Sequence, residues 1–170
     1  MIAGEEERGT LDAVLVTRVS CSSLVVQKAA ALATSVCVLA VVLFVVTLGL
    51  SAVFGMDLRA SEVATGALAM ALLGVEFGFA ALAVGAVTGR RGIALAVGGT
   101  LAVSGYVLYA LGQVVDSFTP WEPLSPFHQT IADGPLGGGV PLSFAWPLVV
   151  ALVVVACAIP VFDRRDIRTV

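Results

Sequence analysis

The residues with reactive side chains are few and do not form pairs. Glu76 is the one charged residue between positions 63 and 89, and His128 is the only histidine in the chain. Acid–base catalysis needs a second carboxylate or histidine within reach of the first, and a catalytic zinc needs three protein ligands. We therefore expect neither a catalytic centre nor a metal site, and a membrane-embedded enzyme is the weakest hypothesis for the function.

Glu76 is still unusual because a charged side chain at the centre of a membrane helix costs ~2.5–3.5 kcal/mol on insertion scales. Two interpretations stay open for it. In one, Glu76 is a protonated carboxyl that is hydrogen-bonded to a neighbouring helix. In the other, it is a polar group that lines a substrate path.

The remaining candidates for chemistry are weak. Cys37 and Cys157 fall inside apolar runs and Cys21 just before one, without the spacing of a metal site or a disulfide framework. We expect them to be small buried hydrophobes or inert thiols. The glycines at 137–139 lack the Lys and Ser/Thr that follow a phosphate-binding loop. A net charge of −3 gives no reason to expect nucleic acid as a partner.

Charged residues make up only 12% of the 170 residues, about half the share of a soluble domain. They are gathered at a few places, and crossing the hydrocarbon layer takes about 20 mostly apolar residues. The chain is therefore predicted to be an all-α membrane protein with four transmembrane helices. A transmembrane domain over 29–170 would contain these spans at about 29–55, 63–88, 92–114 and 143–162.

Basic residues predict the orientation of the four spans. Eight of the nine Lys and Arg residues lie before the first span, between the second and third, or after the fourth; the ninth is Arg59. Because cytoplasmic loops carry the excess of basic residues, both termini and the Arg90–Arg91 turn should be cytoplasmic. The loops 57–62 and 116–142 should then face outside.

The second outer loop, 116–142, contains the signal of a short helix. Ser125 and Pro126 suit the N-cap and the first helical position. The segment is apolar, with Phe127 and Ile131 near Trp121, which indicates a short helix that lies in the interface or re-enters the membrane under cover of the other helices.

Small residues recur inside the second and third spans, where they allow helices to approach closely. They could serve plain packing, or form a stripe that slides during a transport cycle. The glycines concerned are Gly74, Gly78, Gly85 and Gly89 in the second span and Gly98, Gly105 and Gly112 in the third.

The segment before the first span, 1–28, is predicted to be a cytoplasmic helix and elbow. Thr10 can cap a helix that begins at Leu11, and Gly9 lets the chain turn before it. Asp12 in the first turn, with the acidic residues just before the cap, suits the positive end of the helix dipole. Charge alone would also fit a solvated flank of the first span.

The order of these residues resembles a motif of ABC-2 type transporter permeases, in which an E-x-E-x-G-T-L-[ED] stretch forms the coupling helix that docks on the ATP-binding subunit. The matching positions in this chain are Glu5, Glu7, Gly9, Thr10, Leu11 and Asp12. The outer helix at Ser125 and the ending Phe162–Asp166 are also similar to the family pattern. The family often has Pro-x-Ser-Arg after the coupling helix. The matching positions here are Arg18, Ser20 and Cys21, so the proline and the arginine are missing.

The resemblance implies the membrane subunit of an ATP-driven exporter in the cytoplasmic membrane of a prokaryote. The four spans would be equivalent to spans three to six of a six-span permease, so we expect a partial permease. ATP and Mg would bind a separate ABC ATP-binding subunit, with no cofactor on this chain. Further partners would be membrane lipid and either a second permease copy or the missing N-terminal spans. The alternative is a non-transporting permease remnant or accessory multi-pass membrane protein.

The predicted orientation can be tested by labelling single cysteines in a cysteine-free background with a membrane-impermeant reagent. Probes at Ser117 or Gly138 should react from outside the cell, whereas probes at Gly92 or Thr169 should react only after the membrane is opened. Labelling of position 92 in intact cells would contradict the four-span orientation.

Overall fold

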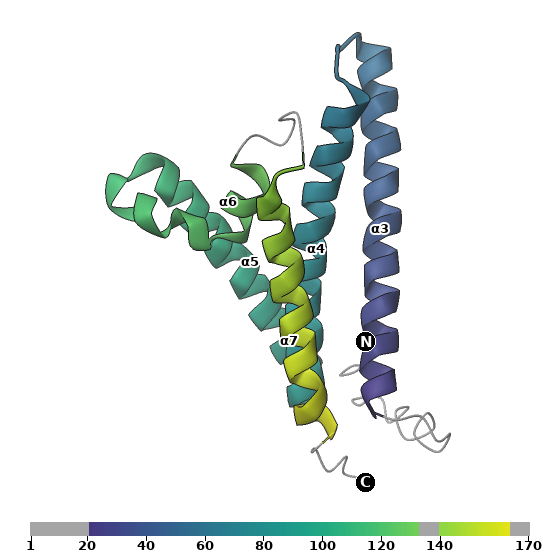
Figure 1. Ribbon diagram of the computed structural model, residues 1–170, viewed down its shortest axis with the longest axis vertical. Helices are drawn as coiled ribbons and strands as arrows, with labels where there is room; N and C mark the ends of the chain where they lie inside the picture. The colour runs from purple at the N-terminus through teal and green to yellow at the C-terminus, as the bar shows by residue number, and fades with distance from the viewer. Residues whose placement is uncertain (1–20, 133–139, 164–170) are drawn as a thin grey trace.

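The computed structural model describes residues 21–132 and 140–163, and within them every regular element is helical (Figure 1). The long helices are α3 (Cys21–Phe54), α4 (Ala60–Thr88), α5 (Arg91–Val114) and α7 (Ala145–Asp163). The short elements are the 3₁₀ segments η1 (Asp116–Leu124) and η2 (Leu142–Phe144) and the helix α6 (Pro126–Ile131). Four helical segments are long and apolar enough to cross a membrane, so the predicted all-α class with four such helices is confirmed.

The connections from α3 to α4 and from α4 to α5 are short, and local groups satisfy the backbone ends there. Gly55 and Gly89 adopt left-handed backbone angles, with φ of 65° and 66°, directly after α3 and α4. Glu62 accepts a hydrogen bond from the backbone N–H of Arg59 at 3.3 Å and so closes the first turn of α4. Only two residues, Gly89 and Arg90, separate α4 from α5.

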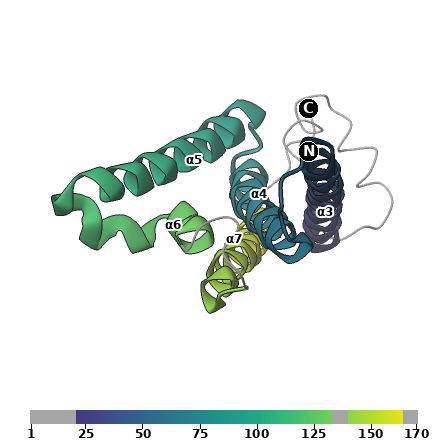
Figure 2. The same cartoon turned by 90° about the horizontal axis from the view of Figure 1, so that it is seen from above.

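Helix α4 is the centre of the bundle and lies between α3 and α7 (Figure 2). The main apolar core joins these three helices, because an apolar face is stabilised by packing against another element. Its members are Leu24, Val25 and Ala29 of α3, Phe79, Leu82 and Ala86 of α4, and Ala151 and Val155 of α7.

Two glycines of α4, Gly74 and Gly78, face α3. A Cβ atom at Gly78 would lie 2.8 Å from Leu32, and one at Gly74 would lie 3.2 Å from Val36. Gly85 is buried, while Gly89 ends the helix with its left-handed conformation. Glu76 lies on another face of α4, away from this seam.

Helix α5 leans away from the other three and meets α4 through Gly98, where an added Cβ would lie 3.0 Å from Cβ of Ala81 (Figure 2). Gly105 and Gly112 lie on the same side but further along, and they contact the segment that follows α5. Much of the apolar surface of α3 and α5 is exposed, as expected of helices that face lipid or other spans. Cys37 and Cys157 are exposed on the helix surface, so of the two expectations for them burial is wrong, and inert thiols stay a prediction.

We predict that Gly98→Val will separate α5 from α4, because neither backbone nor the Cβ of Ala81 can yield to a branched side chain. Overpacking of this kind typically costs about 1–3 kcal/mol. The matched control is Gly99→Val, on the same helix with nothing within 4 Å of an added Cβ. Thermal or detergent-induced unfolding of both purified variants checks this, and equal stability of the two would contradict the packing role.

Candidate functional site

The chain turns back along α5 after it ends, and this returning segment, Asp116–Ile131, comprises η1 and α6. Ser125 starts α6 as its N-cap, with its hydroxyl accepting from the backbone N–H of Phe127 at 3.2 Å and Pro126 next in the helix. The helix start predicted from Ser125 and Pro126 is therefore confirmed. Rigid φ at proline and the hydroxyl cap together fix where the 3₁₀ segment becomes a helix.

Two glycines of α5 form the seat of the returning segment. An added Cβ at Gly105 would lie 3.4 Å from Pro126, and one at Gly112 would lie 2.8 Å from the side chain of Glu122. The spacing of seven residues puts both glycines on one helical face. Two glycines of this heptad therefore allow the returning segment to approach α5 closely, while the third, Gly98, allows α4 to do so.

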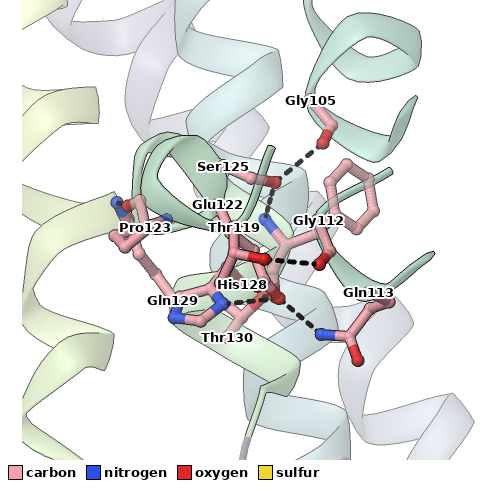
Figure 3. A network of polar contacts seen from close by, with 11 residues as sticks. Gly105, Gly112, Gln113, Thr119, Glu122, Pro123, Ser125, His128, Gln129 and Thr130 are labelled. Carbon is pink, nitrogen blue, oxygen red and sulfur yellow. Dashed lines mark hydrogen bonds and ion pairs between the residues drawn. The ribbon is translucent and has the colours of Figure 1, made fainter. Parts of the chain in front are cut away.

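Hydrogen bonds fasten the segment to the carbonyls of the same two glycines (Figure 3). The buried hydroxyl of Ser125 donates to the carbonyl of Gly105 at 2.7 Å. The hydroxyl of Thr119 donates to the carbonyl of Gly112 at 3.3 Å. Ser125 thus lies level with Gly105, nine residues before the end of α5, which at 1.5 Å per residue is a depth of about 14 Å along that helix.

Glu122 is the charged centre of this attachment. Its side chain is buried, Oε1 accepts a hydrogen bond from Nε2 of Gln113, and Nδ1 of His128 lies 3.0 Å from the same oxygen (Figure 3). The histidine approaches outside the angles of a hydrogen bond, so its contribution is an ion pair when the ring is protonated. A buried carboxylate is tolerated when polar partners compensate its lost hydration.

Aromatic rings close the other side of α6. The ring of Phe127 packs against Phe77 of α4, with centroids 5.7 Å apart, and edge-on against Tyr106 of α5 at 5.6 Å. Such tilted and edge-to-face pairs are favourable geometries. Phe127 therefore ties the returning segment to α4 as well as to α5.

Directly beside these contacts is a cavity of about 350 Å³ with Glu76 in its wall. It lies among α4, α5, α7 and the returning segment. The residues that line it are Glu76, Phe77, Ala80, Leu101, Ser104, Gly105, Leu108, Leu124, Pro126, Val150 and Val154. We call it the Glu76 cavity.

Glu76 is the one ionisable side chain among the described residues that line this cavity. It is 8% exposed, and its Oε2 atom has no hydrogen-bond partner among the described residues. The hydroxyl of Ser104, the other polar side chain of the wall, donates to the carbonyl of Leu101 in its own helix. No described residue of a neighbouring helix therefore makes the hydrogen bond that the protonated, hydrogen-bonded interpretation of Glu76 requires.

The sequence-predicted site residues are thus placed unevenly. Glu5, Glu7, Gly9, Thr10, Leu11 and Asp12 lie outside the described residues. The attachment through Glu122, Gln113 and His128 was missed by sequence reasoning. The sequence did contain a clue to it: Glu122, His128 and Gly112, the third glycine of the heptad, all lie close to the predicted outer loop.

We predict that Glu122→Ala will loosen the returning segment, because Gln113 loses its hydrogen-bond acceptor and His128 loses its acidic neighbour. A hydrogen bond of this kind contributes about 0.5–1.5 kcal/mol. Hydrogen exchange of residues 116–131 should rise severalfold, while exchange in α3 should not change. Asp116→Asn, at an exposed acidic position of the same segment, is the control; equal exchange in both variants would contradict the role of Glu122.

Comparison with known proteins agrees with the resemblance carried by residues 5–12. A family model described as ABC-2 family transporter protein matches residues 1–167, nearly the whole chain. Searches of curated proteins and of solved structures found no match. Proteins of the matched family are non-catalytic, multi-pass membrane subunits that generally pair with ATP-binding subunits. The chain belongs to the ABC-2 family of transporter membrane proteins.

Proposed function

We propose that this chain is the permease part of an ATP-driven exporter, and that the Glu76 cavity lies on its substrate path. The observation that carries the proposal is the cavity itself. A volume of about 350 Å³ is within the range of small-molecule sites. Three long apolar helices form its wall, and the buried Oε2 of Glu76 in this wall has no hydrogen-bond partner in the described part of the chain.

The predicted orientation indicates which side of the cavity faces the outside of the cell. The returning segment lies on the side of α5 and α7 that the basic residues assign to the outside. Its residues Leu124 and Pro126 form part of the cavity wall, so the segment acts as an outer cover. Both termini, and with them the residues 5–12, would lie in the cytoplasm of a prokaryotic cell.

The contacts also suggest which part moves. Helix α5 and the returning segment are fastened together by the Gly105, Gly112 and Glu122 contacts. This unit meets α4 through Gly98 and through the Phe77–Phe127 pair. Helices α3, α4 and α7 share one core. Rocking of the α5 unit against that core would change the width of the Glu76 cavity, since each body is internally tight.

The driving force would come from a separate ABC ATP-binding subunit, which carries ATP and Mg. Glu5 and Glu7 would pair with basic groups of that subunit, while Thr10 holds the start of the coupling helix and Leu11 and Asp12 complete its first turn. A second permease copy would complete the membrane half of the assembly.

The proposal is tested by reversing the charges of the coupling segment with Glu5→Lys and Glu7→Lys together. Losing charge pairs at an interface costs ~2–5 kcal/mol when they are desolvated, so co-purification with the ATP-binding subunit should fall by at least tenfold. ATP hydrolysis should also become uncoupled from transport. Gly9→Val should act in the same direction by blocking the turn before Thr10.

Expression and thermal stability of these variants should stay near wild type, because no span is altered. The control is Asp57→Asn with Asp116→Asn, which changes two exposed acidic residues at the predicted outer side. Wild-type affinity of the double Lys variant at moderate salt would show that the acidic segment is only a solvated flank, and the proposal would lose its coupling site.

A further inference from the structure

The Glu76 cavity combines two properties that together restrict what it can bind. Its lining is apolar except for Glu76 and Ser104, and the Ser104 hydroxyl is already donated to Leu101. Glu76 is only 8% exposed, and its buried Oε2 has no hydrogen-bond partner among the described residues. The cavity therefore offers one carboxyl group that lacks a described donor, in a space that is otherwise mostly apolar.

An unpaired carboxyl in such a place is costly, because a polar group removed from water loses its hydration without compensation. A ligand that brings a positive charge and an N–H donor would restore that interaction. An anionic ligand would be repelled, and no Lys, Arg or His among the described lining residues could compensate it.

The rest of the ligand must match an apolar wall. Side chains such as Phe77, Leu108 and Val154 offer no donors or acceptors. A sugar or a polyphosphate would leave many of its polar groups unpaired there, at about 1–3 kcal/mol for each group in protein mutational data. An aromatic or aliphatic body would instead gain from each apolar surface it covers.

We propose that the Glu76 cavity selects amphipathic monocations: molecules with an apolar body and a single amine that is protonated at neutral pH. The inference rests on the proposed function, because it names the substrate class of that path. Glu76 pairs with the ammonium, Phe77 and the aliphatic wall contact the body, and the cover formed by Leu124 and Pro126 limits its length.

The test uses two fluorescent probes of nearly the same shape, 1-pyrenemethylamine, which is a cation at pH 7, and 1-pyrenemethanol, which is neutral. Each is dialysed against the full chain in phosphatidylcholine nanodiscs, with binding to empty nanodiscs subtracted. The amine should bind at least tenfold tighter than the alcohol. In Glu76→Gln, which keeps the shape and removes the charge, the two probes should bind equally.

Two further variants separate charge from volume. Ala80→Phe fills the cavity from α4 and should weaken both probes severalfold, while Asp57→Asn, an exposed acidic residue in the loop after α3, should keep the preference for the amine. Equal binding of both probes to the wild-type chain overturns the inference, even if no variant folds. A preference that survives in folded Glu76→Gln overturns it as well.

The measurement needs neither nucleotide nor the ATP-binding subunit. Its failure therefore removes the cation preference and leaves the coupling test of the proposed function untouched. Conversely, wild-type affinity of the double Lys variant for the ATP-binding subunit would remove the coupling site and would leave the probe binding as it is.

Discussion

The structure depends on one constraint: a polar group that leaves water must find its partner within the protein. Long helices meet this constraint by themselves, but the returning segment does not, because η1 and α6 are short and irregular. It can lie about 14 Å along α5 only because Ser125 and Thr119 use carbonyls of that helix and Glu122 meets Gln113. The glycines at 105 and 112 make that approach sterically possible.

The cover over the Glu76 cavity follows from the same contacts. Because Ser125 is held at Gly105, Pro126 and Leu124 reach the cavity wall, and Phe127 reaches Phe77 on α4. A change at the seat on α5 therefore acts on the cavity without touching Glu76. This link gives the proposed transporter a route by which movement of α5 changes the space around a substrate.

The helices could be predicted from the sequence because apolar runs of span length have few alternative structures. The start of α6 could also be predicted, since Ser125 and Pro126 act through local backbone chemistry. The role of Gly112 could not be predicted, because the same spacing of glycines is compatible with packing against another helix or against the segment that follows α5. The Glu122 attachment depends on Gln113 and His128, and their meeting depends on how η1 folds back.

Two buried carboxyl groups in this small bundle allow a comparison that sequence alone does not. Glu122 is in contact with Gln113 and His128, and these polar partners explain how its burial is tolerated. Glu76 is buried to a similar extent, yet its Oε2 meets no donor within residues 21–132 and 140–163, and its side chain lines a cavity. A structural carboxyl is expected to be satisfied by its surroundings. Glu76, which is not satisfied in this way, is therefore the better candidate for contact with a transported ligand.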